Sequence, residues 1–324
     1  MVIAALAILV GFALLIWSAD LFVAGAASIA ENLGLSPIII GLTIVSLGTS
    51  APEVLVSITA SLAGSGSLAI GNAIGSNIAN IGMVLGITLL AAPLMVDRRC
   101  MRREVPTLLV VTLGTGFLLL DGHLSRLDGS LMLGALGLLF VQMVRSQSMD
   151  PDLAQEAEEE PLPHLKPLRA WLTFVFGLIL LIGSSRLLVY GAVIAAQEMG
   201  VSELIIGLTV VAIGTSLPEL AATLASALRG HTEIALGNII GSNLFNLLAV
   251  MSLPGIIDPQ ALDPMVLTRD YSVMTFLTLF LAGALYFSHM RSASTRMHSY
   301  VGRTVGMLLV SFYALYYYLL YSTL

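Results

Sequence analysis

The sequence is poor in charged residues and almost free of cysteine, and both shortages narrow the class of protein. Only 10% of its 324 residues are Asp, Glu, Lys or Arg, whereas 57% are hydrophobic. Soluble globular domains do not have that balance, so we expect a membrane protein with many helical spans. The single cysteine, Cys100, excludes an internal disulfide framework and a cysteine-based zinc cluster.

Apolar runs of helical length fill nearly the whole chain. They predict an all-α polytopic membrane protein with ten transmembrane helices and no room for a soluble domain. The predicted spans lie at about 2–30, 36–62, 68–91, 104–121, 127–145, 168–197, 202–228, 233–257, 270–288 and 302–323. The first run has no basic segment before it and continues past Asp20, which favours a retained helix over a cleaved signal peptide.

One stretch of sequence occurs twice with an offset of 166 residues. Residues 41–53 read GLTIVSLGTSAPE and residues 207–219 read GLTVVAIGTSLPE. Each copy places a glutamate, Glu53 or Glu219, within an apolar run. A charged side chain at the centre of a membrane span costs about 2.5–3.5 kcal/mol or more. We therefore expect both glutamates to have a function, with a purely structural buried acid as the alternative.

The proline before each glutamate predicts a break in the helix. Proline has no N–H, so Pro52 and Pro218 leave the carbonyls of Gly48 and Gly214 without a helical donor. Carbonyl, hydroxyl and carboxylate oxygens gathered at one point suit a hard cation such as calcium or sodium. Neither copy contains Cys or His, which argues against a soft or borderline transition metal.

A second motif is repeated with the same offset. Residues 71–80 read GNAIGSNIAN and residues 237–246 read GNIIGSNLFN. On a helix, the four-residue spacing of the polar side chains gives one stripe, which we expect to face the glutamates. The stripes are Asn72, Ser76 and Asn80 in the first copy and Asn238, Ser242 and Asn246 in the second. The alternative is that these residues only join helices, and we assign that packing role to Gly71, Gly75, Gly237 and Gly241.

The repeats divide the chain into two halves built on one plan. We interpret residues 1–146 as a first five-helix repeat, 147–167 as an acidic linker and 168–324 as a second five-helix repeat. Five spans is an odd number, so the second repeat enters the membrane the opposite way up, as in the inverted repeats of secondary transporters. The linker is interpreted as a solvated connection, with a regulatory ion site as the alternative.

The distribution of basic residues predicts the orientation. With the N-terminus outside, eleven Lys and Arg residues fall on the inside and only Arg126 and Arg269 fall in outside loops, a strong positive-inside bias. The inside residues are Arg98, Arg99, Arg102, Arg103, Arg145, Lys166, Arg169, Arg229, Arg291, Arg296 and Arg303. We therefore expect both termini outside, the linker in the cytoplasm, and a multi-pass protein in the cytoplasmic (inner) membrane.

Two charges inside predicted spans are also related by the offset of 166. Asp20 lies in the first predicted helix and Arg186 in the sixth. Each is expensive alone in a membrane and needs a partner or a water-filled cavity. We expect an ion pair between them, and the alternative is a gating contact that changes between two access states.

The four motif copies resemble the alpha repeats of the calcium/cation antiporter superfamily. The whole chain is similar to prokaryotic sodium/calcium exchangers, especially to inner-membrane proteins of the YrbG type. The resemblance implies long tilted helices one and six that slide over an eight-helix core, with four ion subsites between helices 2, 3, 7 and 8. The ligands it implies are Ser46, Thr49, Ser50, Glu53, Ser76 and Asn80 from the first half and Ala212, Thr215, Ser216, Glu219, Ser242 and Asn246 from the second.

The resemblance also implies how some of these residues bind. Thr49 and Thr215 would offer carbonyl oxygens to calcium, and Ser46 and Ala212 would contribute through their backbones. Some relatives carry an aspartate where this chain has Asn246, so the site here has one carboxylate fewer than theirs.

Together these observations predict a sodium/calcium antiporter that exports calcium by alternating access, with three sodium ions per calcium ion implied by the resemblance. Its partners are calcium and sodium ions and the lipid bilayer; we expect no cofactor, no catalytic residue, no nucleic acid and no obligate protein partner. Proton-coupled antiport of calcium, manganese or magnesium is the close alternative. An intramembrane hydrolase or a passive channel fits less well, because duplicated oxygen-rich helix breaks are neither a catalytic cleft nor a filter loop.

Overall fold

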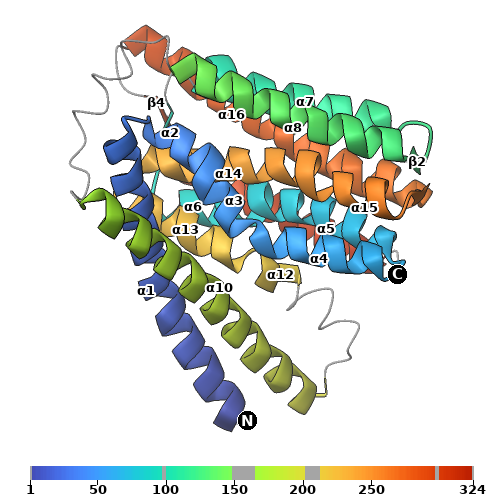
Figure 1. Ribbon diagram of the computed structural model, residues 1–324, viewed down its shortest axis with the longest axis horizontal. Helices are drawn as coiled ribbons and strands as arrows, with labels where there is room; N and C mark the ends of the chain where they lie inside the picture. Colours follow the sequence, from blue (N-terminus) through green and yellow to red (C-terminus); the bar gives the residue numbers. More distant parts are fainter. Residues whose placement is uncertain (1, 97–99, 148–164, 201–211, 296–298, 323–324) are drawn as a thin grey trace.

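The computed structural model describes residues 2–96, 100–147, 165–200, 212–295 and 299–322, most of which are helical (Figure 1). Seven of the described helices are long and apolar enough to cross a membrane, or eight if one bent pair counts as a span. The prediction of a polytopic helical membrane protein is therefore confirmed. The ten-span count stays a prediction, because the beginning of the predicted span 202–228 and most of the acidic linker lie outside the described residues.

The first half consists mainly of helices, three of which contain a π-helical turn (η). Its elements are α1 (Val2–Leu33), α2 (Pro37–Ile40), η1 (Gly41–Val45), α3 (Ser46–Thr49), α4 (Ala51–Leu62), α5 (Gly66–Ala79), η2 (Asn80–Leu85), α6 (Gly86–Ala91), β1 (Leu94–Val96), η3 (Cys100–Glu104), α7 (Val105–Leu118), β2 (His123–Leu124) and α8 (Arg126–Gln147).

The described part of the second half follows the same plan. Its elements are α10 (Pro167–Glu198), α12 (Ala212–Thr215), α13 (Leu217–Leu228), α14 (Thr232–Phe245), η5 (Asn246–Val250), α15 (Ser252–Ile257), β3 (Gln260–Ala261), η6 (Val266–Tyr271), α16 (Ser272–Thr295), β4 (Ser299–Val301) and α17 (Arg303–Ser322).

Two repeat-related spans form the centre of the molecule. In the span Gly66–Ala91 (α5 to α6) 83% of the most apolar window is buried within the protein, and in Thr232–Ile257 (α14 to α15) 89% is buried. These spans carry the Gly-Asn and Gly-Ser-Asn motifs. Small residues allow close helix packing where lipid offers no hydrophobic advantage, and both of these spans have glycines at their contacts.

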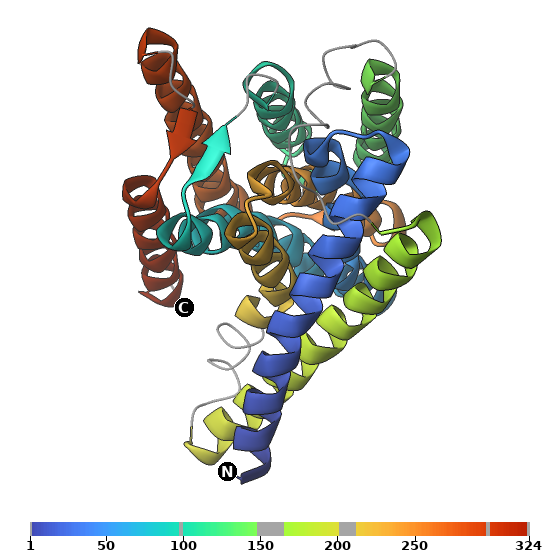
Figure 2. The same cartoon turned by 90° about the vertical axis from the view of Figure 1, so that its left-hand side faces the viewer.

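The long helices α1 and α10 lie side by side and cross the rest of the molecule on a diagonal (Figures 1 and 2). Glycines bring their backbones together: a Cβ on Gly25 would lie 2.5 Å from the nitrogen of Phe174, and one on Gly177 would lie 2.6 Å from the nitrogen of Phe22. The hydroxyls of Ser18 and Ser184, also 166 residues apart, lie within 3.4 Å of one another. This α1–α10 pair is therefore symmetric and held together along its length.

Two short strand pairs join the halves at their ends, a feature that the all-α prediction lacked. Strand β1 pairs antiparallel with β4, and β2 pairs antiparallel with β3. Each pair connects one strand from the first half with one from the second. They fasten the connections after the central spans to the peripheral helices.

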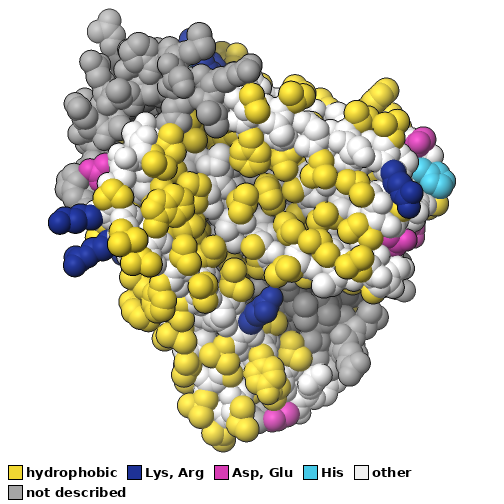
Figure 3. Space-filling view, in the orientation of Figure 1, with side chains coloured by type: hydrophobic (Ala, Val, Ile, Leu, Met, Phe, Trp, Pro, Cys, Tyr) yellow, Lys and Arg dark blue, Asp and Glu magenta, His cyan; other side chains and the backbone are white. Residues whose placement is uncertain are grey.

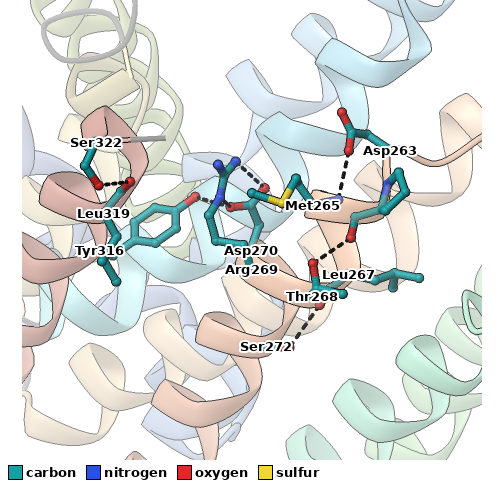
Figure 4. Close-up of polar contacts among 11 residues, drawn as sticks. Asp263, Met265, Leu267, Thr268, Arg269, Asp270, Ser272, Tyr316, Leu319 and Ser322 are labelled. Atoms are coloured by element: carbon teal, nitrogen blue, oxygen red, sulfur yellow. Dashed lines mark hydrogen bonds and ion pairs between the residues drawn. The ribbon is translucent and has the colours of Figure 1, made fainter. Parts of the chain in front are cut away.

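The surface drawn in Figure 3 is mostly hydrophobic, and its charged side chains gather chiefly near the left and right edges. One ionic cluster lies partly buried at a helix end, on η6 (Figure 4). There Arg269 Nε donates to Asp270 Oδ1 at 2.7 Å, and the hydroxyl of Tyr316 donates to the same oxygen at 3.1 Å. The cluster fixes α17 to the start of the α16 span.

Candidate cation site

The helix breaks occur where the proline-glutamate sequences predict them. Helix α3 ends at Thr49 and α4 begins at Ala51, with a bend of 45° between the two segments. In the second copy α12 ends at Thr215 and α13 begins at Leu217, while residues 207–211 lie outside the described residues. Each proline is the second residue of the new helix, where its missing N–H costs nothing.

Each break also positions a glutamate in the first turn of the helix that follows. Glu53 lies in the first turn of α4 and Glu219 in the first turn of α13. Unpaired N–H groups give the start of a helix a partial positive charge, which favours a carboxylate there. The predicted break and the placement of the acid thus have one common cause in the sequence.

The carbonyl of Gly214 accepts a hydrogen bond from outside its own helix. Pro218 cannot donate to it, and the hydroxyl of Ser185 on α10 donates instead, at 3.1 Å. The prediction that proline removes the helical donor therefore fits, but this carbonyl is used within the protein. It links α10 to the residue directly before Thr215.

Both glutamates are completely buried, and they are not equivalent. The hydroxyl of Ser50 donates to Glu219 Oε1 at 3.1 Å across the two repeats. Glu219 Oε2 and both carboxylate oxygens of Glu53 have no hydrogen-bond partner among the described residues. Buried oxygens of this kind are costly unless something else coordinates them.

The asparagines at the end of each polar stripe lie at changes in helix type. Asn80 is the first residue of η2 and Asn246 is the first residue of η5. Both are buried, and neither the oxygen nor the nitrogen of either amide has a described partner. Single π-helical turns often occur at functional sites because they displace backbone and side chains from the regular helix.

The glutamate helices pack across the repeats against these π-helical turns. Helix α4, which carries Glu53, contacts η5, and α13, which carries Glu219, contacts η2. The hydroxyl of Ser57 on α4 donates to the carbonyl of Val250 at 2.8 Å and fixes one of these contacts. The structure thus gathers the four motif copies into one region at the centre of the molecule.

Asn238 is fully engaged in holding neighbouring helices. Its Oδ1 accepts a hydrogen bond from the Thr49 hydroxyl at 3.2 Å, and its Nδ2 donates to the Thr223 hydroxyl at 2.9 Å. Its counterpart Asn72 donates to the backbone carbonyl of Glu53 at 3.3 Å. Asn238 therefore contacts the predicted ligand Thr49, and Asn72 contacts the backbone of Glu53, while the predicted polar lining stays a prediction.

The remaining predicted ligands differ in burial and in hydrogen bonding. The hydroxyl of Ser46 donates to the carbonyl of Leu42 within its own helix, whereas the hydroxyls of Ser216 and Ser242 are buried without a described partner. Ser76 is buried and Thr215 is half-buried. Ala212 is the first residue of α12.

The glycines of the second motif show why the helices approach so closely. A Cβ on Gly237 would lie 2.6 Å from the carbonyl oxygen of Ile38, and one on Gly241 would lie 2.6 Å from that of Leu42. Close packing is thus confirmed for Gly237 and Gly241. It is wrong for Gly71 and Gly75, where an added Cβ would meet no described atom within 4 Å.

The arrangement suits a hard cation bound by oxygen. Among the predicted ligands, the unpartnered buried oxygens belong to two carboxylates, two amides and two hydroxyls. The amide oxygens of Asn77 and Asn243, in the same motifs, also lack a described partner, but these residues are not among the predicted ligands. The part of the chain that the structure describes contains no group of three or more His, Cys, Asp or Glu residues able to hold a metal ion. Two charges among neutral oxygens suit calcium or sodium better than a transition metal.

The predicted ion pair between Asp20 and Arg186 is wrong. Asp20 Oδ1 pairs with Arg229 Nε at 2.9 Å, and Arg229 directly follows α13. Arg186, which has no ion-pair partner among the described residues, lines a cavity of about 560 Å³ between α10 and α4. The cavity reaches Pro52 and Thr215, so water can solvate the Arg186 charge beside the helix breaks.

Comparisons with known proteins agree on one family. A family model described as sodium/calcium exchanger protein matches residues 3–144 and 169–322. The protein CaxA of Alkalimonas amylolytica is 47% identical over the full length of both chains. The inner membrane protein YrbG of Escherichia coli K12 is 39% identical, covering 99% of this chain and 98% of its own. The structure resembles that of the sodium-calcium exchanger NCX_Mj soaked with sodium and strontium, with a TM-score of 0.81, 29% identity and 97% of each chain covered.

Proposed function

The chain belongs to the sodium/calcium exchanger protein family, and on that premise we propose that it exchanges sodium for calcium across the cytoplasmic membrane. The family and its relatives make it a cation antiporter of the calcium exchanger type, a transporter and not an enzyme. The proposal adds three points: sodium is the coupling ion, calcium is exported, and the exchange takes place across the cytoplasmic membrane. Calcium leaves the cell, and sodium entering down its gradient supplies the free energy.

One observation carries the proposal. The buried oxygens of Glu53, Glu219, Asn80 and Asn246 that lack a protein partner come from repeat-related positions, next to helix breaks and π-helical turns. A structural cluster would pair these atoms with each other or with backbone groups. Atoms left without partners are expected where an ion completes the coordination.

We infer that calcium and sodium compete for this site. Two carboxylates give it a formal charge of about −2, which one divalent ion neutralises. Several sodium ions in neighbouring subsites do the same, so the two kinds of ion exclude one another. The proposed ligands are Ser46, Thr49, Ser50, Glu53, Ser76, Asn80, Ala212, Thr215, Ser216, Glu219, Ser242 and Asn246.

The proposed topology follows the inverted repeat. Residues 1–146 form one five-helix repeat and residues 168–324 form the other, with the acidic linker 147–167 in the cytoplasm and both termini outside. The site then lies near the membrane midplane, where interrupted helices meet. Each access state opens it to one side only.

Proton coupling is the second candidate, and one feature supports it. Neither carboxylate oxygen of Glu53 has a described protein partner, so the group is available to a proton as well as to a cation. A proton on each glutamate would balance the departure of one divalent ion. Calcium, manganese or magnesium would then be the exported ion.

The test is radiolabelled calcium uptake into proteoliposomes under separate ion gradients. We expect vesicles loaded with sodium and diluted into sodium-free buffer to accumulate calcium, and vesicles loaded with choline to accumulate none. Uptake driven by an imposed pH gradient without sodium would replace sodium coupling with proton coupling. Absence of uptake under every gradient would contradict calcium antiport itself.

A further inference from the structure

The α1–α10 pair is the part of the described structure best suited to move as a unit. Its two helices are held to one another by Gly25, Gly177 and the contact between Ser18 and Ser184. Most of its surface faces away from the protein, since only 33% of the apolar window of α1 and 28% of that of α10 are buried. In repeat-built transporters, alternating access comes from one such unit moving against the other around a fixed site.

Two polar contacts connect the pair to the helix-break region. The hydroxyl of Ser185 on α10 donates to the Gly214 carbonyl at the break itself. Asp20 on α1 pairs with Arg229 beyond the far end of α13. Movement of the pair along α13 therefore has to separate Asp20 from Arg229, because the two charges belong to different units.

The two ends of the site differ in this conformation. Helices α4 and α13 extend from their breaks toward opposite ends of the molecule (Figure 1). On the α4 side, the cavity lined by Val56, Thr59 and Arg186 reaches the break. On the α13 side, α1 covers α13: Ala222 is buried in a cluster with Ala19 and Phe22, and the Asp20–Arg229 pair lies beyond it.

We propose that the Asp20–Arg229 ion pair is a latch that holds the α1–α10 pair against α13 and keeps the site closed on that side. The pair breaks when access changes sides, and it forms again when the pair of helices returns. The latch rests on the proposed antiport function. The ion pair of Asp20 with Arg229 then sets the equilibrium between the two access states.

The strength of the contact fits a latch that opens in every cycle. Both side chains are about half exposed, at 46% for Asp20 and 39% for Arg229. Arg229 lies at the end of α13, in a predicted inside loop, where water can reach the pair. An ion pair exposed to water shifts an equilibrium by about two- to fivefold. A fully buried pair would cost far more to separate and would hold the protein in one state.

Cross-linking tests the latch in the full-length protein. In a Cys100→Ser background, the pair Asp20→Cys and Arg229→Cys is bridged with a short bis-methanethiosulfonate reagent. The pair Ser18→Cys and Ser184→Cys, within the moving unit, is bridged in the same way as the control. Both proteins are reconstituted, and calcium uptake is measured before bridging, after bridging and after reduction.

We expect the bridge between positions 20 and 229 to reduce uptake at least about tenfold and reduction to restore it, while the bridge between positions 18 and 184 leaves uptake unchanged. Uptake that continues at the unbridged rate with positions 20 and 229 joined would overturn the latch. Arrest by both bridges would also overturn it, because α1 and α10 would then have to separate. Absence of uptake by the unbridged proteins would count against the proposed function instead.

A second readout does not depend on transport. The variant Ala222→Cys, at a position that α1 covers, is made in the Cys100→Ser background. The rate at which N-ethylmaleimide labels this cysteine is measured with and without Asp20→Asn. Loss of the latch should speed labelling about two- to fivefold. A cysteine replacing Ala235, which is buried in the central cluster away from α1, should label at the same rate in both backgrounds. Equal rates at position 222 would contradict the latch even if the ions transported proved different.

Discussion

At the scale of single residues, the two repeats differ in the contacts of Ser50 and Ser216. They occupy equivalent positions, but only the hydroxyl of Ser50 has a described hydrogen bond, and that bond goes to the buried carboxylate of Glu219. The near-identical sequences of the two copies gave no indication of this difference. It arises because each serine meets a different neighbour in the folded chain.

We expect Ser50→Ala to destabilise the ion-free protein and Ser216→Ala to leave it nearly unchanged. Removing Ser50 Oγ deprives a buried carboxylate of its donor, which costs about 1–3 kcal/mol. Removing Ser216 Oγ breaks no described hydrogen bond. The measurement is thermal unfolding in detergent without sodium or calcium, and equal losses of stability in the two variants would contradict the asymmetry.

Asn238 and Asn72 offer a second matched comparison. Asn238 joins Thr49 to Thr223 through two side-chain hydrogen bonds, whereas Asn72 makes one to a backbone carbonyl. We expect Asn238→Ala to weaken calcium binding by about 1–3 kcal/mol, because Thr49 is released from its position beside the site. Asn72→Ala should weaken binding less. Equilibrium binding of radiolabelled calcium tests this, and a larger effect of Asn72→Ala would be the contrary result.

The buried glutamates could be predicted from the sequence, but the contacts that support them could not. A carboxylate inside an apolar run can be recognised from the sequence alone, because ionisable residues in membrane spans are rare and costly. The partner of Asp20 can be identified only from the folded structure. Arg229 is 209 residues away, and the offset of 166 pointed to Arg186 instead.

At the scale of helices, the packing of α1 against α10 depends on positions that cannot carry a side chain. Gly25→Ala would place a methyl group 2.5 Å from the Phe174 backbone, so we expect a loss of about 1–3 kcal/mol in stability. Gly183→Ala in the same pair of helices meets no described atom within 4 Å and should be tolerated.

Thermal unfolding of the two variants in detergent, beside the unchanged protein, checks this difference. A Gly25→Ala protein as stable as Gly183→Ala would show that α1 and α10 are not held at backbone contact.

The helix breaks were predictable from sequence and the π-helical turns were not. Proline determines a break by its own covalent structure, so Pro52 and Pro218 mark α4 and α13 directly. A π-helical turn needs one extra residue in the hydrogen-bonded ring, and no residue type enforces it. The turns that begin at Asn80 and Asn246 pack against α13 and α4, in contacts that sequence patterns do not encode.

At the scale of the whole molecule, exchange of three sodium ions for one calcium ion would move one net charge per cycle. Sodium leaving loaded vesicles would then make their interior negative and oppose further exchange. We expect valinomycin with equal potassium on both sides to raise calcium uptake, because it removes that potential. Uptake that valinomycin leaves unchanged would indicate an electroneutral exchange, such as two monovalent ions for one calcium ion.

The duplicated plan of the molecule could be predicted from the sequence because the motifs recur at one constant offset. The pairing of β1 with β4 and of β2 with β3 could not, since segments of two or three residues carry no periodic signal. The cavity beside Arg186 was also unpredictable. It depends on how α10 is tilted against α4, which long-range packing decides.

Calcium binding to the purified protein tests whether the two repeats contribute to one cation site. If the unpartnered oxygens of both repeats form one cation site, binding should be saturable and reduced by sodium. Glu53→Gln and Glu219→Gln, which keep the side-chain shape but remove its charge, should each lose it. Asp263→Asn, a change at an exposed carboxylate outside the site, should bind as the parent does. Calcium binding at parental affinity by either glutamate variant would contradict a single site shared between the repeats.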